Sequence, residues 1–356
     1  MNRIGVKIAS IFFASIAAGV FLKVITSLLG SRDSDLRRSS QKIPNKNKGK
    51  GKSKLKNTFE EFSYRTNDTR GRAITLSAEK VLEEEKGKYT FDKIKSTFAL
   101  SSGENGTIAA NRVVAIHNDK TVCEFFGRVH LHASSGLIAK TEQSLVDFNR
   151  KIAKGNSKID ISRGDTKISA NEYCFDLDKN VAMLSKNVVG STKSADNTKK
   201  HIAAQTAVIV FDKQYPDSIK SMQLSGKPSL TTNEYTLSSD ERIIYDSDKI
   251  VAELGVTLVY KNNSDNVYIK SKQMIAKLRN SKIQSIDASG GLVVRTKDAT
   301  IKADRAVLCG DRVVASENVV ITNSYGDIFS DAAELDLKTK KILLRKSSGI
   351  LCNGKA

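Results

Sequence analysis

The stretch SGGLVVRTKDATIKADRAVLCGDRVVASENVVIT, from Ser289 to Thr322, holds the two features that decide the fold. One is the phrase IKADRA, which begins at Ile301: an aliphatic residue, one residue of any kind, then a small residue. The other is a small or turn residue followed by an alternating apolar run, as in SENVVIT. Alternation with a period of two indicates a strand with one buried and one solvated face. The stretch therefore predicts strand, turn, strand, turn.

The phrase occurs nine times, at spacings of 27 to 35 residues, and its third residue is Ala or Ser except in the weakest copy, which has Lys140. Its copies begin at Leu76, Ile108, Ile138, Ile168, Ile202, Leu237, Ile269, Ile301 and Ile328. A period between about 20 and 50 residues is typical of stacked supersecondary units. The chain after residue 58 is therefore predicted to be an elongated all-β stack or sandwich. Only residues 79–88 could form a helix, and their charge density fits a solvated strand end equally well.

Composition agrees with thin β units. The chain has no Trp, 3 Pro and 39% hydrophobic residues, which is low for one compact core of 356 residues. Strands with one solvated face produce this balance. Pro228 removes one ladder donor and predicts an edge position for its strand. The chain has no Gly-rich phosphate loop, HExxH, GxSxG or paired CxxC, so we expect no catalytic residues, no cofactor and no enzyme activity.

The amino terminus is predicted to be a transmembrane signal anchor over residues 1–30. Residues 8–22 are apolar or small, and the apolar character continues to Leu29. About 20 apolar residues span a bilayer, provided that Lys7 and Lys23 extend to the interface. A cleaved signal peptide is the alternative, but the triplet that resembles a cleavage site, Ser15–Ala17, lies inside the apolar run.

Residues 31–57 are polar and Lys-rich, which predicts a disordered tether. Residues 1–56 carry 13 Lys and Arg against 2 Asp, so most of the formal charge of +19 precedes the repeats. A tether of this kind suits anionic lipid head groups, whereas nucleic-acid binding would need aromatics among the basic residues. Orientation stays open: the basic residues after the span favour cytoplasmic repeats, and the short basic leader favours export.

The repeats resemble two families of the lipopolysaccharide transport bridge. GRAITLSAEKV, NGTIAANRVV, EFFGRVHLHASSGLIAKTEQSLVDF and SKIDISRGDTKISANEYCFDLDKNVAMLSKNV resemble the membrane-anchored LptC family. From HIAAQTAVIVF to ELDLKTKKILL the chain is similar to the LptA (OstA-like) family, through SMQLSGKPSL, YIKSKQMIAKL, ASGGLVVRTKDATIKADRAVLCGDRVVASENVVIT and DIFSDAAELDLKTKKI. The resemblance covers nearly everything after residue 58 and joins two modules behind one anchor.

This resemblance implies tandem open, twisted β-jelly rolls stacked end to end: an LptC-like module over 58–197, an LptA/OstA-like module over 198–350 and a tail over 351–356. The implied protein is single-pass in the inner membrane with a periplasmic C-terminal domain. It carries acyl chains of lipopolysaccharide or a related glycolipid from an inner-membrane ABC transporter. Its edge strands, near residues 59–64 and 328–344, would meet the transporter and the next bridge module or an outer-membrane receiver. The alternative function is a structural β-solenoid or membrane scaffold.

The candidate lipid-groove residues are inward aliphatic positions, which any β-stack also needs as core. They are Val129, Leu131, Ile159, Ile161, Ile168, Leu224, Ile243, Val256, Leu258, Ile269, Leu292, Val294, Ile301, Val319, Ile321, Leu335 and Leu337. No metal site is expected, since His130 and His132 lie two apart without nearby Cys or His. Cys123 and Cys174 could form a disulfide, and a buried free thiol fits equally well.

Overall fold

A computed structural model describes most of the chain after residue 57. The described ranges are 58–67, 73–85, 87–99, 105–117, 121–134, 136–147, 150–176, 179–193, 199–211, 219–246, 248–261, 266–279 and 282–351. Within them every regular element is a β-strand, and every paired register is antiparallel, which confirms the all-β prediction. Residues 79–85 belong to a strand, not a helix. These ranges contain no helix capable of crossing a membrane. The predicted anchor and tether lie outside the described residues.

The described chain divides into two units. The N-terminal unit comprises residues up to 164 together with 169–182, and the C-terminal unit comprises 165–168 and 183 onward. The division between sequence modules at residue 197 stays a prediction. The strands of the N-terminal unit are β1 (Thr58–Asn67), β2 (Ala73–Glu85), β3 (Lys88–Ala99), β4 (Asn105–His117), β5 (Thr121–Ala133), β6 (Leu137–Asp147), β7 (Ile152–Gly155), β8 (Ile159–Arg163) and β10 (Glu172–Asp176). Two strands are shared between the units: β9 (Thr166–Ala170) belongs to the C-terminal unit up to residue 168, and β11 (Val181–Lys193) belongs to it from residue 183.

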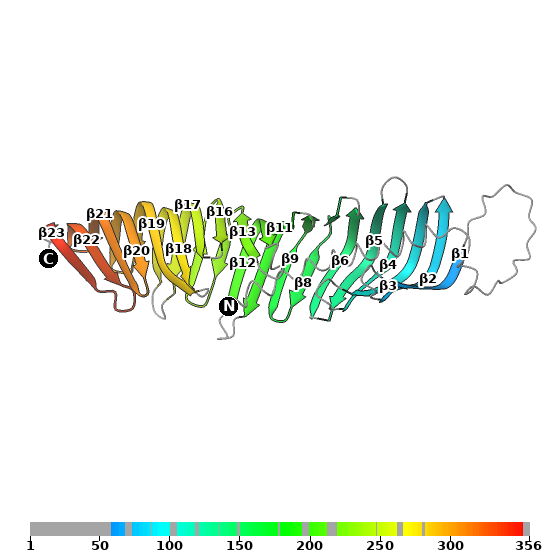
Figure 1. The fold of residues 1–356 in the computed structure, drawn as a ribbon. Helices are drawn as coiled ribbons and strands as arrows, with labels where there is room; N and C mark the ends of the chain where they lie inside the picture. Colours follow the sequence, from blue (N-terminus) through cyan, green and yellow to red (C-terminus); the bar gives the residue numbers. More distant parts are fainter. Residues whose placement is uncertain are drawn as a thin grey trace, which may run out of the picture. The chain divides into compact units, whose positions relative to one another are not determined.

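In the C-terminal unit the strands from β17 to β23 follow one another in chain order (Figure 1). Its strands after β11 are β12 (Lys199–Phe211), β13 (Ile219–Ser225), β14 (Ser229–Thr231), β15 (Tyr235–Ser238), β16 (Arg242–Asp246), β17 (Lys249–Tyr260), β18 (Val267–Arg279), β19 (Lys282–Arg295), β20 (Ala299–Cys309), β21 (Arg312–Asn323), β22 (Gly326–Asp336) and β23 (Ile342–Leu351). From β17 to β23 each strand pairs with the next one in the chain, so neighbours in sequence are also neighbours in the sheet. Between β12 and β17 the order differs, because β14 pairs with β12 and β15 pairs with β17.

The long strands bend in the middle. The register of β17 with β18 shifts between Glu253 and Val256, and equivalent shifts occur in the following pairs. Two consecutive residues with positive φ mark six of the bends: Gly127 and Arg128, Lys186 and Asn187, Gly226 and Lys227, Leu254 and Gly255, Gly290 and Gly291, and Glu317 and Asn318. Such bulges bend a strand sharply and re-aim its side chains. The turn residues of the second sequence landmark therefore form a corner in the chain. We call the two consecutive residues with positive φ at such a corner the corner pair.

The repeated phrase spans the bend of its own strand, as residues 269–274 do in β18 and residues 301–306 in β20. Its first residues form a ladder across neighbouring strands, in which Ile269 pairs with Leu258 and Val294, and Ile301 with Val294 and Ile321. All five side chains are buried, and each contributes roughly 1.5–3 kcal/mol. The phrase thus supplies the continuous aliphatic lining that its periodicity predicts.

The small third residue of the phrase faces a larger neighbour beside the corner. Ser271 pairs with Val256, Ala303 with Leu292, and Ser330 with Val319. Space on the inner side of a bend is limited, so large and small side chains alternate there. This packing explains why Ala or Ser recurs at that position.

The fourth residue of the phrase packs against a corner glycine of a neighbouring strand. A Cβ at each glycine would lie within 3 Å of that side chain, in four pairs: Gly127 with Asn111, Gly226 with Gln205, Gly255 with Asp240, and Gly290 with Lys272. At the next corner Asn318 replaces glycine and donates a hydrogen bond to Asp304 Oδ2. Sequence spacing did not reveal this contact, which joins the two landmarks of the repeat.

The edge position predicted for Pro228 is wrong. Pro228 lies between β13 and β14, which both pair with β12, and its carbonyl accepts a hydrogen bond from Ser239 N at 3.1 Å. A proline fits here because the ladder is already interrupted at the corner pair. The sequence signal marked a strand break.

Cys123 and Cys174 are both free thiols. Cys123 pairs with Val146, which pairs with Ala153, which pairs with Phe175. Three strand spacings of about 4.8 Å separate the two cysteines, too far for a disulfide. Cys123 also faces the core, whereas Cys174 alternates with the buried Phe175. His130 and His132 are exposed on β5, and the described residues hold no cluster able to bind a metal.

The thiols are expected to differ in reactivity toward iodoacetamide. Burial raises the pKa of Cys123, while Cys309 is exposed. Only the thiolate reacts, so Cys123 should be alkylated more than about 10³-fold more slowly than Cys309, until denaturant unfolds the chain. Mass spectrometry of the cysteine-containing peptides measures both rates. Similar rates in the native protein would contradict the buried position of Cys123.

Candidate functional site: an apolar cavity

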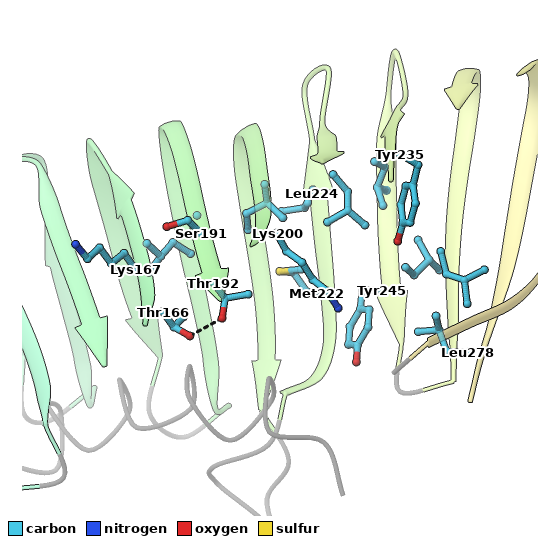
Figure 2. A pocket seen from close by; sticks show the side chains of 17 residues that line it. Thr166, Lys167, Ser191, Thr192, Lys200, Met222, Leu224, Tyr235, Tyr245 and Leu278 are labelled. Atoms are coloured by element: carbon cyan, nitrogen blue, oxygen red, sulfur yellow. Dashed lines mark hydrogen bonds between the residues drawn. The ribbon is translucent and has the colours of Figure 1, made fainter. Parts of the chain in front are cut away.

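An apolar cavity of about 150 Å³ opens within the C-terminal unit. Figure 2 shows its lining, to which β9 and every strand from β11 to β19 contribute. The lining residues are Thr166, Lys167, Ile168, Gly190, Ser191, Thr192, Lys200, Ile202, Met222, Leu224, Leu230, Tyr235, Ile243, Tyr245, Ile250, Leu278 and Ile283. An apolar cavity of roughly this volume holds a benzene-sized group. The site can therefore accept a segment of an alkyl chain.

The bends divide the strands of this unit into two halves, which we call half A and half B. Half A contains β13, β16 and residues 249–253, 273–279, 282–289, 305–309, 312–316, 332–336 and 342–345. Half B contains β14, β15 and residues 256–260, 267–271, 292–295, 299–303, 319–323, 326–330 and 347–351. Inward residues of both halves are buried, and the cavity draws on both, so the halves face one another.

The cavity lies where the strands are interrupted. Elsewhere a single long strand supplies both halves, as β17 and β18 do. Here two short strands take the place of each long one: β13 and β14 replace one long strand, and β15 and β16 replace the next. β13 pairs with β16 in half A, and β14 pairs with β15 in half B. The interruption leaves Met222, Leu230 and Tyr235 only partly buried on the inner side. The sheet therefore opens at this point instead of closing on its own side chains.

Hydrogen bonds hold the aromatic wall of the cavity in place. Thr232 Oγ1 accepts bonds from the backbone N–H groups of Glu234 and Tyr235, at 3.2 and 3.0 Å. The carbonyl of Thr232 accepts a bond from Lys261 Nζ at 2.9 Å. On the opposite wall Thr166 Oγ1 and Thr192 Oγ1 lie 2.9 Å apart and satisfy one another (Figure 2). These hydroxyl and backbone groups of the cavity wall are thus paired locally.

The chemistry of the lining is that of a binding site. The two lysines are Lys167, which is exposed, and Lys200, which is half-buried. No carboxylate, histidine or cysteine is among the lining residues, all of which the structure describes. Burial raises the pKa of Tyr235 to about 12, with a smaller contribution from Glu234, and burial also raises the pKa of Tyr245. Both hydroxyls therefore stay neutral at physiological pH.

The raised pKa of Tyr235 predicts a pH dependence of stability. Above pH 10 the unfolded chain ionises this phenol, while the folded chain keeps it protonated up to about pH 12. Its contribution is complete below pH 10 and is lost as pH rises to 12. Tyr235→Phe should therefore weaken the fall of unfolding free energy over this range, measured by urea denaturation. Equal slopes for both proteins would contradict the burial of Tyr235.

All 17 candidate groove residues are buried, with exposures of 0 to 6%. Three of them, Ile168, Leu224 and Ile243, line the cavity, and the other candidates do not. A side chain with no exposed surface, such as Val256 or Leu335, offers nothing to a ligand while the halves are closed. Contact of these residues with lipid stays a prediction that requires the halves to separate.

Sequence reasoning missed most of the cavity lining. Ile202 begins a copy of the phrase and Tyr235 precedes one by two residues, yet their exposure depends on the broken strands around them. The available signal was the run LSGKPSL, whose proline marks the interruption at residues 226–228. Gly190 was also missed, although its absent side chain leaves room for Ile202, whose Cγ1 would lie 2.6 Å from an added Cβ.

Comparison with known proteins places the first part of the chain. Residues 24–193 match the family described as Lipopolysaccharide-assembly, LptC-related. The match covers the described N-terminal unit and ends beside Thr192 in the cavity wall. No curated protein matches the chain significantly.

Proposed function

We propose that this chain carries the acyl chains of lipopolysaccharide, or of a related glycolipid, along the inner side of its folded sheet. The LptC-related domain over residues 24–193 supports a role in lipopolysaccharide transport at the level of the family. The observation that carries the finer proposal is the open apolar cavity, bounded by inward residues of two facing half-sheets. Acyl chains would lie inside while the sugars stay in water.

The energetics favour a lining of this kind. Each exposed CH₂ costs about 0.8 kcal/mol, so a chain of about twelve carbons loses roughly 10 kcal/mol in water. Beyond the cavity the inner side of half B carries an aliphatic ladder through Leu258, Ile269 and Val294, which would be exposed to lipid when the halves separate. It contains no deep polar pocket that would hold the lipid at one point. A shallow, uniform surface suits transfer better than tight binding.

The proposed setting follows the same family. We propose a single-pass anchor over residues 1–30 in the inner membrane and a periplasmic pair of tandem open β-jelly rolls, LptC-like up to about residue 197 and LptA/OstA-like after it. The transporter would meet β1, which pairs on one side with β2. The next bridge module or an outer-membrane receiver would meet β23, which pairs on one side with β22.

Photo-cross-linking of the full chain in membranes tests the proposal. Met222 lines the cavity, whereas its neighbour Gln223 is exposed on the other side of β13. A photoreactive residue at position 222 should capture a glycolipid, and the same residue at position 223 should capture little. Equal capture of glycolipid at both positions, or no capture at position 222 in a folded protein, would contradict the proposed acyl-chain groove and favour a structural β-stack.

A further inference from the structure

Beside the cavity, one hydrogen bond joins the two halves of the sheet across their open side. Tyr260 Oη donates to Asp311 Oδ1 at 2.9 Å. Tyr260 is the last residue of β17 in half B, and Asp311 lies in the turn between β20 and β21 in half A. The corner pairs close the other side of the sheet, so this bond crosses the mouth through which a lipid head group would project.

In both halves of the sheet, the residues that form this hydrogen bond lie next to elements that line the cavity. In half B, Tyr260 pairs with Tyr235, which lines the cavity. In half A, the cavity ends at Leu278 and Ile283, and the next turn along that face contains Asp311. The Tyr260–Asp311 bond therefore links the two halves immediately beyond the cavity, and we call this link the rung.

Asp311 is held in position from its own side. Lys338 Nζ lies 2.6 Å from Asp311 Oδ2, and Leu337 N donates to the Asp311 carbonyl at 2.7 Å. Hydrogen bonds from Lys338 and then Tyr260 lower the pKa of Asp311, so the carboxylate stays charged. Leu337 itself is completely buried beneath this turn. The ion pair thus fixes the turn that the tyrosine reaches.

Beyond this rung the interior is largely closed. Most inward side chains of β20 to β22 are buried, among them Ala315 and Leu335, while Ile328 is half-buried. The accessible cavity described above lies before the rung, on the side of β9 and of β11 to β16. The two stretches therefore differ in accessibility on either side of one hydrogen bond.

We infer that Tyr260, Asp311 and Lys338 form a clasp that must open before an amphiphile bound in the cavity can pass toward β23. A head group outside the sheet and an acyl chain inside it cannot slide past a side chain that bridges the mouth. An exposed ion pair and one hydrogen bond are weak enough to open by thermal motion. The clasp would set the rate of passage while leaving binding at the cavity unchanged. This inference rests on the proposed lipid-carrying function.

Photolabelling of the full chain in nanodiscs tests the clasp. The probe is a dodecyl glycoside with a diazirine in its alkyl chain, and peptide mass spectrometry locates its adducts. In the natural sequence, adducts should concentrate on the Met222 peptide. Tyr260→Phe removes only the hydroxyl and should raise adducts on the β19–β22 peptides at least about three-fold, with Met222 labelling unchanged. Tyr268→Phe, on the exposed face of β18, is the matched control and should behave like the natural sequence.

A second variant that removes the same interaction keeps the test valid if the first variant fails to fold. Asp311→Ala should produce the same rise, and Tyr260→Phe combined with Asp311→Ala should produce no further rise, because both remove one interaction. Unchanged distal labelling in folded variants would overturn the clasp. Absence of adducts on the Met222 peptide in the natural sequence would instead overturn the lipid-carrying function itself. Thermal unfolding of each variant shows which ones are folded.

Discussion

Replacing Gly290 with alanine is expected to destabilise the protein by roughly 2–5 kcal/mol, whereas alanine at Gly291 should cost only about 1–2 kcal/mol. Both residues have nearly the same positive φ, 83° and 82°. The strain that a positive φ places on an alanine is therefore similar in the two variants. They differ in space, because a Cβ at Gly290 would lie 2.7 Å from Lys272 Cβ, and a Cβ at Gly291 would meet nothing within 4 Å.

Urea denaturation of the two variants, followed by circular dichroism, measures the difference. Lys272 Cβ is fixed to the backbone of β18, so it cannot move aside without shifting the strand. Gly290→Ala should therefore unfold at clearly lower urea concentration than Gly291→Ala. Equal midpoints would mean that the corner accommodates a side chain, and that the contact between phrase and corner contributes little to the fold.

Replacing Met222 with tryptophan should weaken binding of a dodecyl glycoside by roughly 50-fold. An indole is larger than the benzene-sized group that a cavity of about 150 Å³ holds, so it would fill the site. Displacing about three methylenes into water costs roughly 2.4 kcal/mol. Met222 is only partly buried, so the larger ring can be accommodated with little strain in the core.

Tryptophan at Gln223 provides the matched control. The side chain of Gln223 is exposed on the other side of the same strand, so this variant should bind the glycoside as the natural sequence does. Isothermal titration calorimetry on the full chain measures both affinities. Equal affinities for the two variants would show that the amphiphile binds elsewhere, and the cavity would lose its proposed role.

Part of the site could be predicted from sequence and part could not. Ile168, Leu224 and Ile243 follow from alternation, since each is an apolar residue on the inner face of a short strand. Tyr235 and Tyr245 do not, because their place in the cavity depends on β15 and β16 replacing one long strand. The interruption makes both tyrosines half-buried, although alternation alone would have placed them in a closed core or in solvent.

The tandem β-repeat is a property of the sequence itself. Period-two alternation, an aliphatic residue and a small third residue recur every 27 to 35 residues, and these local patterns depend on no distant partner. The contacts between Lys272 and Gly290 and between Tyr260 and Asp311 were decided only by the tertiary structure. They join residues 18 and 51 positions apart, and a register shift at each corner sets which side chains meet. Alternation specifies which face of a strand is buried, whereas strand breaks and bends decide where the folded sheet stays open and where it closes.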